Sequence, residues 1–139
     1  MLGTIVKVEM LGEDVLGVII GEQEYEYKNP YYTIARSTLN ATDEHIEQLK
    51  QTSLNDLLSF DTSTRVKNQV EEVGEIAEKE YFVEKVKHYT NLYQPLRTIE
   101  LVEKSKELPK DIDPLHRHIF LDIANDKGVY NIVYSMLAS

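Results

Sequence analysis

The sequence contains no cysteine. Disulfide bonds, thiolate metal ligands and cysteine nucleophiles are therefore excluded, and a reducing interior suits the chain better than secretion. Tryptophan is absent too, and the six glycines form neither the G-x-x-x-x-G-K-[ST] nor the G-x-G-x-x-G pattern of loops that bind nucleotide phosphates. No serine lies in a G-x-S-x-G motif, so nothing favours a hydrolase triad.

Long apolar runs are also missing. The longest are only a few residues, whereas a membrane-spanning helix needs about 18. The N-terminal MLGTIVKVEM has neither a basic start nor a small-residue cleavage site, so we expect no signal peptide. We therefore predict a cytoplasmic protein without a membrane segment.

The composition is that of a folded acidic protein. Of 139 residues, 42% are hydrophobic and 28% charged, which is close to the globular average and sufficient for one buried core. The chain has twenty-four acidic and fifteen basic residues, which give a formal charge of -9. This charge disfavours a nucleic-acid partner, because it repels phosphate backbones. It serves either solubility alone or an acidic face that meets a basic partner protein.

The first 37 residues have the pattern of short β-strands. Side chains alternate over 4–9, a β-branched run covers 15–20, and further strands are expected over 22–28 and 31–35. Residues 11–14 can turn the chain, and Asn29-Pro30 should interrupt strand pairing because proline lacks an amide donor.

From about Asn40 the pattern becomes helical. Helix caps are expected at Thr42, at Ser53 with Asp56, within 62–64, and at Asp113 before Pro114, while Leu108-Pro109 and Gly128 mark helix ends. An apolar stripe places Val66, Val70, Val73, Ala77 and Tyr81 on one helical face. A second stripe of different phase holds Phe82, Val83, Val86, Tyr89 and Tyr93. A buried amphipathic helix is predicted over 129–137.

Together these patterns predict an α+β fold. A small, strongly bent antiparallel sheet or partial barrel over 1–37 precedes a helical bundle over 38–139, and both pack as one domain.

Four carboxylates recur at helical spacing in the predicted helix after residue 64: Glu71, Glu72, Glu75 and Glu78. Several carboxylates on one helix face can bind Mg²⁺. The run EEVGE here resembles the E-x-x-E motif of MazG-type nucleotide pyrophosphohydrolases, which implies hydrolysis by a metal-activated water. The family's second motif, E-x-x-D on a following helix, has no counterpart, and a solvated acidic face is the alternative.

Two other clusters are weaker candidates. His118 and Asp122 share a helical face but His116 does not, so these three residues do not form a complete metal site. Tyrosine is unusually frequent in the strand region, where it suits either a half-buried sheet surface or a recognition surface. The candidate binding residues are Tyr25, Tyr27, Tyr31, Tyr32 and Arg36.

The N-terminal stretches VKVEMLGEDVLGVII and EYEYKNPYYTIA resemble small Sm-like or SH3-like β modules, particularly phage-type versions. This resemblance implies strand edges that pair between subunits, and hence a homo-oligomer.

We predict a binding or regulatory protein that acts through protein contacts without catalysis and without a cofactor. One concrete version is a phage or mobile-element inhibitor of a host factor. The alternatives are a Mg²⁺-dependent pyrophosphohydrolase of MazG type and an oligomer that holds a small nucleotide near Tyr31, Tyr32 and Arg36 without turnover.

Overall fold

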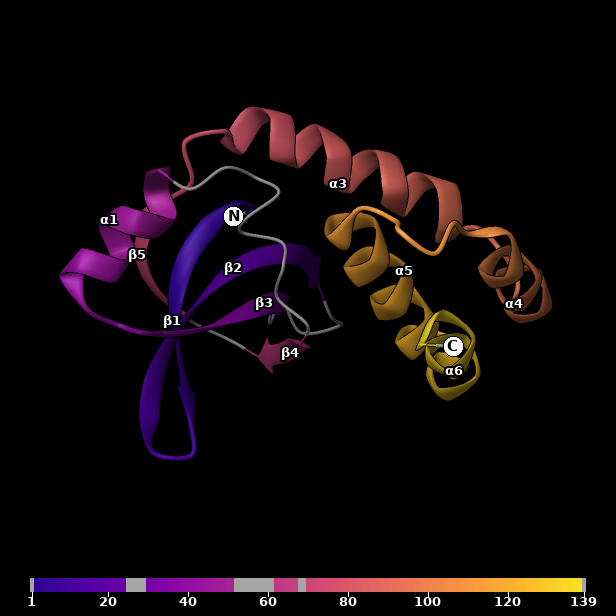
Figure 1. The fold of residues 1–139 in the computed structure, drawn as a ribbon, viewed down its shortest axis with the longest axis horizontal. Coiled ribbons are helices and arrows are strands. Elements are labelled where there is room, and N and C mark those ends of the chain that lie inside the picture. Colours follow the sequence, from indigo (N-terminus) through magenta and orange to yellow (C-terminus); the bar gives the residue numbers. More distant parts are fainter. Residues whose placement is uncertain (1, 25–29, 52–61, 68–69, 139) are drawn as a thin grey trace. The chain divides into compact units, whose positions relative to one another are not determined.

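The computed structural model describes residues 2–24, 30–51, 62–67 and 70–138, and it confirms the α+β fold (Figure 1). An antiparallel sheet is formed in the N-terminal part and helices follow it. The elements are β1 (Thr4–Met10), β2 (Glu13–Glu24), β3 (Pro30–Asn40), α1 (Asp43–Gln51), β4 (Thr62–Lys67), β5 (Glu71–Glu75), α3 (Lys79–Tyr93), α4 (Thr98–Glu107), α5 (Pro114–Asp126) and α6 (Tyr130–Ala138).

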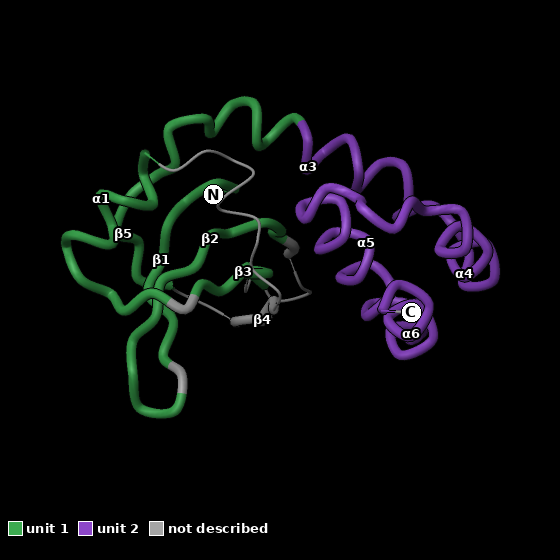
Figure 2. Tube along the Cα trace, in the orientation of Figure 1, with its two compact units in different colours: residues 1–84 green, residues 85–139 purple. Residues whose placement is uncertain are grey.

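The chain divides into two compact units, residues 1–84 and 85–139, and the division falls inside α3 (Figure 2). The first unit contains all the described strands, and the second contains α4, α5 and α6 with the latter part of α3. Among the described residues, no helix is long and apolar enough to cross a membrane.

The sheet has five strands in the order β4-β3-β2-β1-β5, with every neighbouring pair antiparallel. Irregularities in the register interrupt the β2–β3 and β1–β5 pairings, and such bulges bend a sheet. Gly17 of β2 lies so close to β3 that an added Cβ would overlap the side chain of Ile34. Small size at this position lets the two strands approach.

A core cluster forms on one side of this sheet from residues of three strands and is joined by Val70, just before β5. Its buried members are Val6, Val8, Ile19, Tyr32 and Ile34. Ile5, Leu16 and Val18 are also buried. Since neighbouring strand residues point to opposite faces, both faces of the sheet are covered in part.

The β1–β2 hairpin turns within two residues, Leu11 and Gly12, because Met10 already pairs with Glu13. The φ angles are 52° at Leu11 and 82° at Gly12, as a type I′ turn requires at both central positions. Glycine adopts this conformation without strain, whereas leucine does so rarely. Figure 1 shows the hairpin projecting beyond the other strands.

The prediction of a helix starting at 62–64 was wrong over the described residues 62–67 and 71–75, and only its last residues, 79–81, are helical, at the start of α3. Residues that were expected to cap and continue a helix form β4 and β5, and β3 continues past residue 37 to Asn40. The apolar helical face proposed to end at Tyr81 does not form, because Val66 lies in β4 and Val73 in β5, and the Tyr81 side chain is 54% exposed. The second stripe was correct, because Phe82, Val86 and Tyr93 of α3 are buried. The expected cap at Ser53 and Asp56 lies outside the described residues.

Several predicted helix ends are confirmed. Thr42 Oγ1 accepts a hydrogen bond from the His45 amide at 3.2 Å at the start of α1. Asp113 Oδ1 accepts one from the Leu115 amide at 3.0 Å at the start of α5. Gly128 has a φ of 76° after α5, the left-handed conformation typical of helix ends.

The C-terminal helix α6 was correctly placed but is less buried than expected. Val133 is buried, whereas Ile132 is 51% exposed. Tyr130 and Tyr134 are also exposed and stack with ring centroids 5.7 Å apart. The amphipathic pattern therefore identified the helix and its buried residue Val133, but it did not predict which other apolar side chains are exposed.

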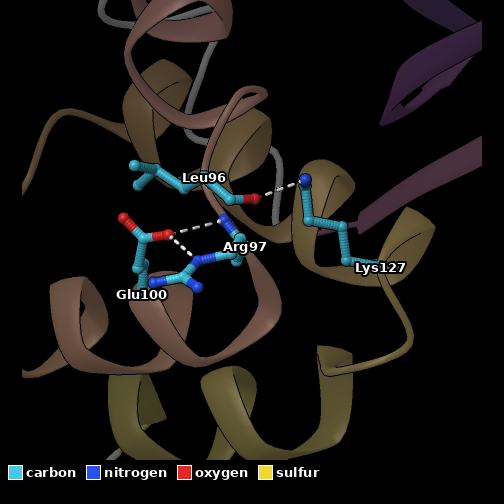
Figure 3. Close-up of polar contacts among 4 residues, drawn as sticks. All are labelled: Leu96, Arg97, Glu100 and Lys127. Carbon is cyan, nitrogen blue, oxygen red and sulfur yellow. Dashed lines mark hydrogen bonds and ion pairs between the residues drawn. The ribbon is translucent and has the colours of Figure 1, made fainter.

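Polar contacts stabilise the start of α4, and one of them links it to the end of α5 (Figure 3). Glu100 Oε1 accepts hydrogen bonds from the Arg97 amide at 3.3 Å and from its Nε at 2.6 Å. These contacts lower the pKa of Glu100. Lys127 Nζ donates to the Leu96 carbonyl at 2.5 Å. The charged lysine thereby satisfies a carbonyl just outside α4.

Candidate functional site

The predicted carboxylates lie on an edge strand and not on a helix. Glu71, Glu72 and Glu75 belong to β5, the last strand of the sheet, and Glu78 follows it before α3. Because neighbouring strand residues point to opposite faces, these carboxylates do not gather as they would on a helix. The geometric basis of the predicted Mg²⁺ site is therefore wrong. No group of three histidine, aspartate or glutamate side chains among the described residues is arranged to hold a metal ion.

The acidic residues of β5 are exposed, and two of them make surface ion pairs. Lys7 Nζ lies 3.4 Å from Glu71 Oε1, and Lys79 Nζ lies 2.6 Å from Glu75 Oε1. Glu72 forms no such pair within the described part of the chain. Exposed pairs of this kind contribute about 0 to 1 kcal/mol to stability. Their charges therefore remain accessible to a partner.

Helix α1 lies beside this edge strand. The amide of Ala77, just after β5, donates to the Lys50 carbonyl at 3.0 Å, and a Cβ added at Gly74 of β5 would overlap the Lys50 side chain. Helix α1 adds its own exposed carboxylates, Asp43, Glu44 and Glu47. The neighbourhood of β5 is therefore rich in negative charge.

Charge is divided unequally between the two units. Residues 1–84 contain seventeen acidic and seven basic residues, a formal charge of -10. Residues 85–139 contain seven acidic and eight basic residues, a formal charge of +1. The acidity of the protein therefore belongs to the sheet unit alone.

The predicted tyrosine surface is only partly described. Tyr25 and Tyr27 lie outside the described residues. Tyr31 is half-buried, while Tyr32 is buried in the sheet core. Burial raises the pKa of Tyr32, and the carboxylates of Glu22 and Glu72 raise it further. Tyr32 therefore supports the core.

Arg36, the remaining member of that candidate surface, is half-buried on β3. In the strand register it lies opposite Gly17 of β2 on one side and Thr62 of β4 on the other. Strand β3 thus holds it inside the sheet between two neighbours.

Sequence reasoning missed an aromatic and histidine cluster in the second unit. The rings of Tyr89 and His116 stack with centroids 4.2 Å apart, and Tyr93 Oη lies 2.7 Å from His116 Nε2. Tyr93 also packs edge-on against Phe120 at 4.6 Å. The helical spacing of Tyr89 and Tyr93 on α3 was visible in the sequence, but their pairing with α5 was not.

Burial lowers the pKa of His116, and His88 and Lys85 lower it further, while Asp113 opposes them. Asp113 also pairs with Lys85, whose Nζ lies 2.5 Å from Asp113 Oδ2. Since the other carboxylate oxygen caps α5, one aspartate links α3 to the start of α5. The contacts of Tyr89 and Tyr93 with His116, and of Lys85 with Asp113, therefore hold α3 and α5 together.

His118 is buried and Asp122 is half-buried on the same helix, α5.

Comparison of the chain with protein-family models, curated proteins and solved structures gives no match.

Proposed function

We propose that this protein acts by binding another protein, without catalysis, and that the acidic surface of the sheet unit meets a basic partner. The observation that carries the proposal is the concentration of charge, because residues 1–84 hold seventeen acidic residues against seven basic ones. A field of one sign steers an oppositely charged partner and accelerates its association.

The edge strand β5 is the part of this surface best suited to contact. Its glutamates are exposed, and it is the last strand of the sheet on its side. An edge strand offers backbone donors and acceptors to a partner as well as side chains. Charge would bring the partner to this edge, and contacts with β5 and α1 would hold it there.

The test replaces the three β5 glutamates at once, with Glu71→Gln, Glu72→Gln and Glu75→Gln. The matched control is Glu103→Gln, Glu107→Gln and Asp111→Asn in the helical unit. Both variants remove three exposed negative charges, and each loses two surface ion pairs with lysine. Any difference between them therefore reports the position of the charges and not their number.

Each full-length protein is immobilised, exposed to a cell extract and washed at about 50 mM and about 300 mM salt, across which charge screening strengthens markedly. Proteins that the wild type and the control retain at low salt should be lost from the β5 variant. The proposal is wrong if all three proteins retain the same set.

A further inference from the structure

The helical unit contains a pocket of about 440 Å³ at the end of α4, the start of α5 and the end of α6. Three of its lining residues are basic and none is acidic, although the chain as a whole has more acidic than basic residues. The basic lining residues are Lys106, Lys110 and Arg117.

The pocket combines apolar walls with available positive charge. Leu108, Ile112 and Met136 supply apolar surface, and Met136 is positioned by its sulfur, which lies 2.9 Å from Ser105 Oγ. Among the described residues, neither Lys110 nor Arg117 has an ion pair through its side chain. Lys106 pairs only at the surface, with Glu103 at 3.2 Å. A ligand that fits has an apolar group flanked by carboxylates.

The tip of the β1–β2 hairpin has that chemistry. Leu11 is completely exposed and occupies a turn position, with a φ of 52°, that asparagine or glycine would fill with less strain. Glu9, Glu13 and Asp14 on either side of it are exposed and make no ion pairs within the described residues. An apolar side chain in a strained and fully exposed position suggests that Leu11 contacts another molecule.

We propose that the hairpin tip of one copy of this protein binds the pocket of a second copy. Leu11 enters between the apolar walls, and the carboxylates of Glu9, Glu13 and Asp14 face Lys106, Lys110 and Arg117. This inference deepens the proposed function, because it names a second copy as one protein partner. It uses residues other than those of β5, so the two proposals can fail separately.

The contact is heterologous, since each copy offers one tip and one pocket. Repetition of such a contact either closes into a ring or continues as a chain. Charge makes the contact weaker as salt rises, because exposed charges are screened. The wild type should therefore associate with increasing concentration at low salt, as measured by sedimentation velocity and native mass spectrometry.

Two single variants test the two sides. Leu11→Asn removes the apolar tip and suits the turn better, so the variant should fold at least as well as the wild type. Lys110→Glu reverses an exposed charge in the pocket. Each should weaken self-association about tenfold or more, as loss of a central contact does. The matched controls are Leu92→Asn and Lys87→Glu, which change exposed residues of α3 outside the pocket and should leave association unchanged.

Mixing the two variants gives the sharpest readout. Leu11→Asn retains its pocket and Lys110→Glu retains its tip, so an equimolar mixture has one productive contact for each pair of molecules. We expect a discrete one-to-one complex that does not grow, while the wild type forms larger species.

Three results would overturn this proposal: a wild type that stays monomeric, variants that associate as the wild type does, or a mixture that forms no complex. If the wild type is monomeric but Lys110→Glu loses proteins retained from extract, the pocket takes an acidic segment of a different protein. The β5 triple variant should self-associate normally, even if it loses its basic partner.

Discussion

The two units of this chain build their cores from contacts of different range and carry different charge. In the sheet unit, β1 pairs with β2 immediately after it and with β5 from the far end of the unit. In the helical unit, α4, α5 and α6 follow one another with short connections, and α6 packs on both α5 and α4. The sheet unit has a formal charge of -10 and the helical unit +1. A chain organised in this way can reserve one unit for electrostatic attraction while the other offers a pocket of opposite sign.

The largest expected effects come from truncating one core at a time. Ile34 in the sheet and Leu115 in α5 are both fully buried, so they form a matched pair. Ile34→Ala and Leu115→Ala should each cost about 2 to 5 kcal/mol of unfolding free energy, from lost burial and the cavity left behind. Hydrogen exchange of the full-length protein locates the effect. We expect Ile34→Ala to lower protection first in β1, β2 and β3, and Leu115→Ala to lower it first in α4, α5 and α6.

If both truncations lowered protection equally throughout the chain, the two units would unfold together, and the expectation that they unfold separately would be wrong.

A smaller effect is expected at Asp113, which caps α5 and pairs with Lys85. Asp113→Ala removes both contacts and should destabilise the helical unit by about 2 kcal/mol. Asp113→Asn keeps an oxygen that can cap the helix and loses only the charge, so it should cost less. Thermal unfolding of both variants measures the difference. Equal losses would mean that the ion pair, and not the cap, dominates.

The smallest effect concerns His116, whose pKa is lowered chiefly by burial. In the unfolded chain the ring has an ordinary pKa of about 6.5. Between the lowered pKa and that value, the unfolded state binds more protons than the folded state, so stability falls as pH falls through about 6.5. Above that pH neither state binds this proton, so the loss of stability is absent.

NMR titration of the His116 ring protons measures this pKa directly. Tyr93→Phe serves as the variant that keeps the aromatic packing while removing the hydroxyl 2.7 Å from His116 Nε2. A measured pKa at or above about 6.5 in the wild type would contradict the argument from burial.

The sequence predicted those parts of the fold that depend on local signals. Alternation and β-branched residues identified β1, β3 and the 15–20 part of β2, but residues 22–24 continue β2 and do not begin the separate strand that was expected over 22–28. Single residues with strong preferences marked helix ends: Thr42, Asp113 before Pro114, and Gly128. These signals act through a residue's own backbone or its nearest neighbours. They therefore persist without knowledge of the tertiary structure.

Strands β4 and β5 escaped prediction because their stability comes from neighbours far away in the chain. Val66, Val70 and Val73 fall at helical spacing, yet β4 pairs with β3 and β5 with β1. Strand preference depends strongly on such context. The alternation of Thr62, Thr64 and Val66 with polar residues was the signal that could have identified β4.

The candidate sites were predicted less well for the same reason. The glutamates of β5 were correctly chosen as exposed acidic residues, but the wrong secondary structure gave them a metal-binding geometry that they lack. The pocket gathers residues from α4, the segment before α5, α5 itself and α6. No local pattern connects Lys106, Lys110 and Arg117 with Met136.

The pairing of Thr4 with Glu75 has a consequence for the order of folding during synthesis. Strand β1 is synthesised roughly 70 residues before β5, its outer neighbour, and long-range pairing of this kind is slow. Until then β1 is an open edge next to apolar side chains, which is the condition under which chains aggregate. Slower translation before residue 75 would prolong that exposure, whereas the helical unit, with its short connections, would be far less sensitive to the rate of synthesis.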